Sequence, residues 1–485
     1  MKIKLYITCI LLFATVLITG CTKENNERIP ITTNSEKALE YFNTGLELSQ
    51  NIRGQEAVYY YLKAIGEDND FAMAYVQLAM VQSTPKLVFK YLNKAKSLIE
   101  NVSEGEALSI LAIEAGLNNE REKQNNYYLE LIELYPNDAN LHNVYGGLLY
   151  GMPNYKTAIK HLKRAIELDP ELSQPYNMLG YSYRQLGDFE KAEYYFKQYI
   201  ALISDQPNPY DSYAELLLKK GEFEKSIEYY RKALEIKPNF IASIIGIATN
   251  LTLMDKQEEA CDTLAGIEDV TSDPGDLRRM HLAKAVVNVD YRNFERAVQE
   301  LEANISISKG IEDDVSLGND LINLATLHLM KGNHDKALKY YEKSMEYYER
   351  SNISQDLKYY LRRQLFANGA RVAYFKNDVE TIKKYKQKYE YSADKTLNLN
   401  EIRNIHELGG HISILEGDFE NAIYEYNQAN LENPIILYLI GTAYEELGDY
   451  KRSKKYYDTV AHFNSYNDMN YAFIRKTALD KLTEY

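Results

Sequence analysis

Residues 405–411, Ile-His-Glu-Leu-Gly-Gly-His, contain the residue types of a zinc-dependent hydrolytic site. Such sites place two histidines four residues apart on a helix, so that both rings reach one metal ion, with a glutamate beside them as general base. Here His406 and His411 are five residues apart, which puts their side chains about 140° apart on a helix that advances about 100° per residue. We therefore expect neither a zinc site nor a peptidase here.

The other candidates for chemistry also lack the spacing that a site needs. None of the remaining six histidines stands three or four residues from a second histidine, so no pair shares a helix face. These histidines are His142, His161, His281, His328, His334 and His462. Ser83 and Lys86 have the Ser-x-x-Lys spacing of β-lactamases, but the companion motifs are missing, and Thr84 before Pro85 is better suited to starting a helix. No glycine-rich phosphate loop and no Gly-x-Ser-x-Gly motif occurs in the sequence.

Length and charge narrow the class of protein further. A chain of 485 residues is too long for one compact core, which favours several domains or an array of repeats. The net charge is −14 and no block of lysine and arginine occurs, so nucleic-acid binding is not expected. We predict no catalytic residue, no cofactor and no metal ion. A catalytic site assembled from distant segments would leave no motif, and that alternative stays open.

The first residues have the layout of a secretory signal. Two lysines precede an apolar run over residues 5–18, which is too short for a comfortable membrane span. The run ends in Ile-Thr-Gly-Cys at 18–21, which resembles the lipobox of bacterial lipoproteins. The resemblance implies that residues 1–20 are removed and that Cys21 is lipid-modified and anchors the chain to a membrane. An uncleaved signal anchor is the alternative.

The residues that follow Cys21 indicate where the anchored chain would lie. Residues 21–34 comprise the cysteine and a polar stretch without helical periodicity, and we expect them to form a flexible tether. Thr22 is not the aspartate that retains enterobacterial lipoproteins at the inner membrane, and Lys23-Glu24 resembles the surface-export signal of Bacteroidota lipoproteins. We therefore expect an outer-membrane lipoprotein in the envelope of a Gram-negative bacterium, on its periplasmic or its surface face.

A repeat of about 34 residues, long enough for two helices, governs the rest of the chain. Small residues recur at equal spacing at Gly146, Gly180 and Ala214. Two consecutive units, 173–206 and 207–240, share a pattern of aromatic, small and leucine positions. Its members are Tyr176, Leu179, Gly180, Tyr183, Ala192 and Phe196 in the first unit, and Tyr210, Tyr213, Ala214, Phe223, Tyr230, Ala233 and Pro238 in the second. This pattern resembles the tetratricopeptide repeat.

The same register extends over most of the chain. Units begin near Ala38, Ala72, Gly105, Ala139, Ser173, Pro207, Ile241, Arg278, Gly318, Arg363, Arg403 and Pro434. The resemblance implies an all-α, right-handed superhelical solenoid of roughly a dozen helix-turn-helix units over residues 35–485, in which stacking supplies the core. Apolar residues at helical spacing in 469–485 predict a capping helix.

The repeat also accounts for the glycines of the opening motif. In the unit that begins at Arg403, Gly410 takes the eighth position, where a small residue lets the two helices of a unit approach closely. Tyr426 takes the aromatic position that fills the space between them. We therefore expect residues 405–411 to lie in the first helix of a late repeat.

Three stretches break the register and collect proline, glycine and acidic residues: 268–277, 308–316 and 391–400. We expect longer loops there, and hinges between sub-stacks are the alternative.

The family binds partners in a concave groove lined by the first helix of each unit. The positions that face this groove are Asn140, Asn143, Tyr150, Gln174, Asn177, Tyr181, Arg184, Gln185, Asp211, Glu215 and Lys219. Amide and aromatic side chains on a rigid wall suit an extended peptide. The carboxylate clamp of some members needs a lysine and an asparagine where this chain has Asn143 and Gly147, so we do not expect that clamp.

We expect a non-catalytic interaction scaffold or adaptor lipoprotein. One alternative is a sensor or regulatory subunit that recognises a peptide or a glycan, and another is a polar groove that binds nothing. The sequence identifies neither the partner protein nor the oligomeric state.

Overall fold

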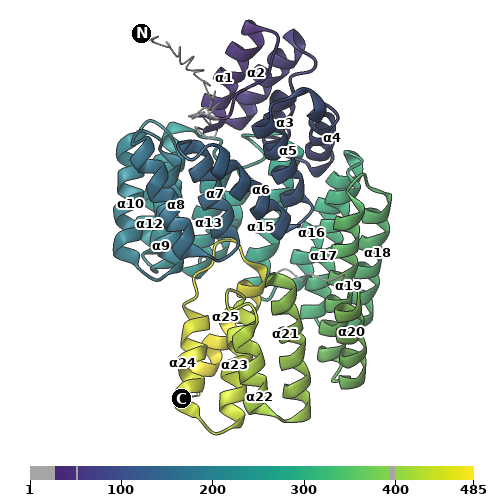
Figure 1. The fold of residues 1–485 in the computed structure, drawn as a ribbon. Helices are drawn as coiled ribbons and strands as arrows, with labels where there is room; N and C mark the ends of the chain where they lie inside the picture. The colour runs from purple at the N-terminus through teal and green to yellow at the C-terminus, as the bar shows by residue number, and fades with distance from the viewer. Residues whose placement is uncertain (1–27, 51–52, 393–398, 485) are drawn as a thin grey trace, which may run out of the picture.

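The computed structural model describes residues 28–50, 53–392 and 399–484 and contains only helices in those ranges (Figure 1). The predicted signal peptide and Cys21 lie outside the described residues. Across the described ranges, no helix combines the length and the apolar character needed to cross a membrane.

The helices of the first six hairpins are α1 (Glu36–Gln50), α2 (Gly54–Glu67), α3 (Ala72–Met80), α4 (Pro85–Lys96), α5 (Glu104–Leu117), α6 (Arg121–Leu134), α7 (Ala139–Gly151), α8 (Tyr155–Leu168), α9 (Gln174–Gln185), α10 (Phe189–Leu202), α11 (Asn208–Lys219) and α12 (Phe223–Ile236). The next six hairpins comprise α13 (Ile241–Leu253), α14 (Gln257–Ala265), α15 (Pro274–Asp290), α16 (Phe294–Gly310), α17 (Asp314–Met330), α18 (His334–Arg350), α19 (Gln355–Phe375), α20 (Val379–Tyr391), α21 (Leu399–Glu416), α22 (Phe419–Gln428), α23 (Pro434–Glu446) and α24 (Tyr450–Ala461). A last helix, α25 (Met469–Leu482), follows them.

Each odd-numbered helix up to α23 packs against the even-numbered helix that follows it, and neighbouring hairpins stack on one another. The predicted all-α array of helix-turn-helix units is therefore confirmed, and α25 corresponds to the predicted last helix. Residues 405–411 lie within α21, the first helix of its hairpin, as the repeat register predicts.

Close approach within a hairpin depends on the small residue of the repeat. A Cβ added at Gly180 would lie 2.6 Å from the Phe196 ring, and one added at Gly410 would lie 2.4 Å from the Tyr426 ring. In both hairpins the aromatic side chain stands sixteen residues after the glycine and packs against the helix that carries the glycine. The glycines of the opening motif are thus packing residues.

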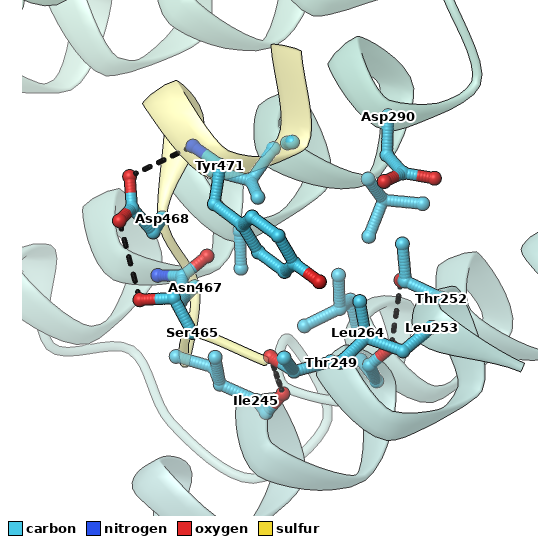
Figure 2. A pocket seen from close by; sticks show the side chains of 15 residues that line it. Ile245, Thr249, Thr252, Leu253, Leu264, Asp290, Ser465, Asn467, Asp468 and Tyr471 are labelled. Carbon is cyan, nitrogen blue, oxygen red and sulfur yellow. Dashed lines mark hydrogen bonds between the residues drawn. The ribbon is translucent and has the colours of Figure 1, made fainter. Parts of the chain in front are cut away.

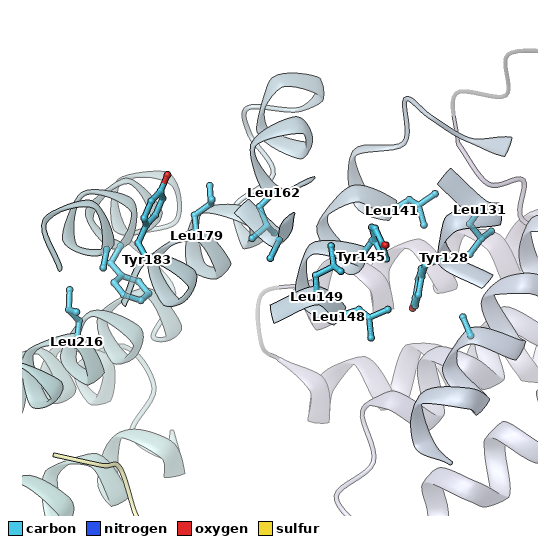
Figure 3. Close-up of a cluster of buried hydrophobic side chains, with 14 of the residues drawn as sticks. Tyr128, Leu131, Leu141, Tyr145, Leu148, Leu149, Leu162, Leu179, Tyr183 and Leu216 are labelled. Atoms are coloured by element: carbon cyan, nitrogen blue, oxygen red, sulfur yellow. The ribbon is translucent and has the colours of Figure 1, made fainter. Parts of the chain in front are cut away.

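Buried apolar clusters extend across neighbouring hairpins. Figure 3 shows Leu131 of α6, Tyr145 of α7, Leu162 of α8 and Leu179 of α9 among the buried side chains of one cluster. Each hairpin buries apolar side chains against its neighbours, so the stability of the array is shared along the stack.

The period lengthens in the second half of the array. Helices α15 to α18 have 17 residues each and α19 has 21. Residues 268–277 form the connection into α15 and its first turn, and 308–316 cover the end of α16 and the start of α17. Of the third stretch, 391–400, residues 393–398 lie outside the described residues. The choice between longer loops and hinges stays a prediction.

The array turns back on itself, so that units far apart in sequence come together (Figure 1). Helix α4 packs on α17, and the Lys86 backbone N–H donates to Asp313 Oδ2 at 3.1 Å. Helix α25 packs on α15 as well as on α23 and α24. The last helix therefore joins the end of the array to its middle.

The described end of the predicted tether is held against the first hairpins. The Ile29 backbone N–H donates to Asp138 at 3.3 Å, and Thr32 donates to Glu106 through both its backbone N–H and its hydroxyl. Thr33 donates to Asp68 at 2.6 Å. These bonds fix residues 29–33 along the starts of α5 and α7 and the end of α2.

Candidate functional site

Five of the eleven predicted groove residues form one connected strip across α7, α9 and α11. Gln185 Nε2 donates to the Tyr150 hydroxyl at 3.3 Å, and the Tyr150 and Tyr181 rings are 6.4 Å apart. The Arg184 guanidinium lies 4.6 Å from the centre of the Tyr181 ring and donates to Glu215 at 3.2 Å. We call the face of these helices that carries the predicted residues the groove face.

Except for Lys219, the other predicted residues lie nearer the starts of the same helices. Asp211 is buried and accepts a hydrogen bond from the Ser243 hydroxyl at 2.6 Å. Asn143 and Asn177 occupy the same position in successive units, and their buried amide oxygens have no hydrogen-bond partner among the described residues. Asn140 and Gln174 are half-buried. A binding role for the eleven residues stays a prediction.

A cavity of about 280 Å³ opens at the ends of α9 and α11. Four predicted residues line it: Arg184, Gln185, Glu215 and Lys219. Its other walls are Leu218 of α11, together with Glu432 and residues 463–466 from the last units of the array. The cavity therefore exists because the array closes on itself.

Lys219 joins the two sides of this cavity. Its ammonium donates to the Phe463 carbonyl oxygen at 2.5 Å and lies 3.8 Å from the centre of the Phe463 ring. On the same side of the array, the Tyr155 hydroxyl donates to Glu432 Oε1 at 2.6 Å. The two contacts join the middle of the array to the start of α23 and to the end of α24.

Burial governs the ionisation of the charged groups on the groove face. It raises the pKa of Glu215, and burial together with the neighbouring Glu215 raises the pKa of Asp211. Burial, followed by the positive charge of Arg184, lowers the pKa of Lys219 to about 8. The ammonium of Lys219 is thus poorly compensated by the protein around it.

The C-terminal segment covers the groove face of α13 and α15. The Tyr466 hydroxyl donates to the carbonyl oxygen of Ala242 at 2.9 Å. Figure 2 shows Tyr471 directed toward Thr252 and Leu253 of α13, while Asp468 accepts bonds from the Tyr471 backbone and from Ser465. Little space remains there, since the cavity in Figure 2 measures only about 20 Å³.

Sequence reasoning missed Glu432, Phe463 and Tyr466, because repeat positions describe neighbours and not the contacts of a closed array. The available signal was the stretch His-Phe-Asn-Ser-Tyr-Asn-Asp at 462–468, which interrupts the helical pattern between α24 and α25.

The first helices of the later units are held together by charge pairs that the sequence analysis also missed. Arg278 of α15 donates to Asp320 of α17 at 2.7 Å, and Arg371 of α19 donates to Glu407 of α21 at 2.6 and 2.9 Å. Asp320 and Glu407 are buried. Each pair links the first helices of two successive units, so the glutamate of the opening motif serves packing between units.

The histidines of the opening motif have separate partners. His406 Nδ1 lies 2.7 Å from Glu425, and His411 Nδ1 lies 2.8 Å from the Tyr426 hydroxyl. The His411 ring also stacks on Tyr374, with ring centres 4.2 Å apart. Within the described part of the chain, no group of three or more side chains that could hold a metal ion comes together.

Comparisons with known proteins match the repeats individually. Models of the tetratricopeptide repeat match residues 161–194, 214–240, 321–352 and 434–461. No curated protein matches the chain. Similar solved structures include a tetratricopeptide repeat protein from Parabacteroides merdae, with 14% identity over 56% of this chain and 98% of that one, at a TM-score of 0.37. Another is the MamA protein, with 20% identity over 34% of this chain and 90% of that one, at a TM-score of 0.29. The four sequence matches fall on separate parts of the helical array, and we conclude that the chain contains tetratricopeptide repeats.

Proposed function

We propose that this protein is a non-catalytic scaffold or adaptor that binds an extended segment of a partner protein along its groove face. Tetratricopeptide-repeat proteins generally serve as protein-interaction scaffolds and are typically non-catalytic. Stacked repeats present long, preformed surfaces of this kind.

The observation that carries the proposal is the connected strip from Tyr150 through Tyr181 and Arg184 to Glu215. Three successive units contribute to it, so its side chains are held in place by packing on both sides. Aromatic and arginine side chains in such settings dominate the binding energy of protein interfaces.

The test is cross-linking in cells followed by isolation of the partner. We expect a partner whose recovery falls at least about tenfold when Tyr150 and Tyr181 are both changed to alanine, since loss of a hot-spot side chain costs about 2 kcal/mol or more. Tyr194→Ala is the matched control, because that side chain is 57% exposed on the second helix of its hairpin. Equal recovery with all variants would exclude the groove face as the interface.

We further propose that the scaffold is an outer-membrane lipoprotein of a Gram-negative envelope, held by lipid on Cys21. The support is the apolar leader that ends in Ile-Thr-Gly-Cys at 18–21. Cys21→Ala should release the protein from membranes, as measured by fractionation. Membrane association that survives this change would contradict the proposal.

The cavity beside Lys219 favours a second candidate function, that of a ligand-binding sensor or regulatory subunit. Its walls come from the middle and the end of the array, so an occupant would contact both parts.

A further inference from the structure

The charges of the cavity beside Lys219 are those of a site for a small zwitterion. Arg184 and Glu215 are paired with each other. Lys219 and Glu432 remain, one positive and one negative, on walls that come from different parts of the array. A ligand with one carboxylate and one ammonium group complements the charges of Lys219 and Glu432, whereas Glu432 would repel a simple anion.

Both cationic side chains have hydrogen-bond donors to spare. Among the described residues, Arg184 donates only to Glu215, and Lys219 donates only to the Phe463 carbonyl oxygen. Both side chains are half-buried, and a charge withdrawn from water is costly unless it is well paired. A carboxylate placed between them would accept charge-assisted hydrogen bonds, which are the strong ones in proteins.

Glu432 has one carboxylate oxygen with capacity for a further hydrogen bond. Glu432 Oε1 accepts from the Tyr155 hydroxyl at 2.6 Å, and its other oxygen accepts from no described residue. A ligand ammonium could donate to this oxygen. The Phe463 ring provides apolar surface for the rest of the ligand.

The volume limits the size of the ligand. The cavity measures about 280 Å³, close to the lower end of the range for small-molecule pockets, about 300–1,000 Å³. A single amino acid fits this space, whereas a helix or a folded peptide does not. We propose that the cavity binds a free α-amino acid, whose carboxylate is held by Lys219 and Arg184 and whose ammonium is held by Glu432.

Binding would also brace the closed array. Lys219 and Arg184 belong to the middle units, while Glu432 precedes α23 and Phe463 follows α24. A ligand held by both sets adds a bridge between them. This inference goes beyond the scaffold function, because it requires no protein partner.

The experiment is calorimetric titration of the purified protein with glycine, L-alanine, L-serine, L-glutamate and L-phenylalanine. We expect at least one of them to bind with a dissociation constant of about 1 mM or tighter. The amide of that amino acid, which lacks the carboxylate, and its N-acetyl form, which lacks the ammonium, should each bind at least about tenfold more weakly.

Variants locate the site. Lys219→Met and Glu432→Gln should each weaken binding at least about tenfold. Lys220→Met is the matched control, because Lys220 is exposed, pairs with Glu193 and Glu222, and does not line the cavity. Its affinity should not change. Hydrogen exchange in residues 462–482 should slow when the amino acid is added, and Lys219→Met should abolish this effect.

Several outcomes would overturn the inference. The first is that none of the five amino acids binds at a concentration of about 10 mM. The second is that the N-acetyl form binds as tightly as the free amino acid. The third is that Lys220→Met weakens binding as much as Lys219→Met does. None of them bears on the scaffold proposal, which depends on recovery of a partner in cells.

Discussion

At the scale of single residues, the most informative position in residues 405–411 is Gly410, which has no side chain. Gly410 faces the Tyr426 ring so closely that a Cβ would lie 2.4 Å from it. The two histidines of this stretch, His406 and His411, bond to Glu425 and to Tyr426, which are packing partners within the same hairpin. Gly410 stands where the zinc motif needs its second histidine, and the repeat needs a small residue there.

Gly410→Ala should therefore destabilise the α21–α22 hairpin by about 1–3 kcal/mol, the usual cost of overpacking. Gly147→Ala is the matched control, since it also lies within a helix and an added Cβ there meets nothing within 4 Å. That change should be neutral or stabilise by up to about 1 kcal/mol through helix propensity. Thermal unfolding and hydrogen exchange in residues 399–428 measure both. Equal effects of the two substitutions would contradict the packing role of Gly410.

At the scale of elements, the sequence predicts the hairpins well because their determinants are local. Gly180 and Phe196 are sixteen residues apart in the printed sequence and meet in the structure. The candidate site is different. The strip from Tyr150 to Glu215 could be predicted, because it follows the repeat, but Lys219 and Phe463 are 244 residues apart and no periodicity relates them.

The docking of α25 on α15 depends on a buried ion pair that makes a sharp test. Arg475 donates to both carboxylate oxygens of Asp290 at 2.7 Å, and both residues are at most 5% exposed. Arg475→Met would leave the Asp290 charge buried and without its principal partner, which typically costs about 3–5 kcal/mol.

We expect this substitution to release α25, seen as faster hydrogen exchange and proteolysis in residues 462–482. The double variant Arg475→Met with Asp290→Leu should regain most of the protection, since an apolar pair of similar volume replaces the ions. Arg292→Met is the control. It removes the exposed pair with Asp480, which is worth less than about 1 kcal/mol. Similar exchange in the Arg475 and Arg292 single variants would show that the buried pair does not hold α25.

At the scale of the whole molecule, closure distinguishes this array from an open solenoid. The main helix–helix contacts between distant units are those of α4 with α17 and of α25 with α15. An open array can change its curvature, because each unit contacts only its neighbours. A closed one holds its groove face at a fixed curvature, and it creates a cavity whose walls no single segment supplies.

Removal of residues 462–485 tests whether α25 maintains this closure. Without that segment, the last two hairpins lose the packing of α25 on α15, and the exposed bond between Tyr155 and Glu432 remains. The gap left is at least one helix diameter, about 10 Å, so the last units should swing away from the middle. Small-angle X-ray scattering should show a larger radius of gyration and a longer maximum dimension for the monomer, with size-exclusion chromatography to exclude association. Removal of residues 483–485, which follow α25, should leave the scattering curve unchanged. If the longer truncation scatters as the intact chain does, then the stacking of neighbouring hairpins alone sets the curvature, and α25 acts only as a cap.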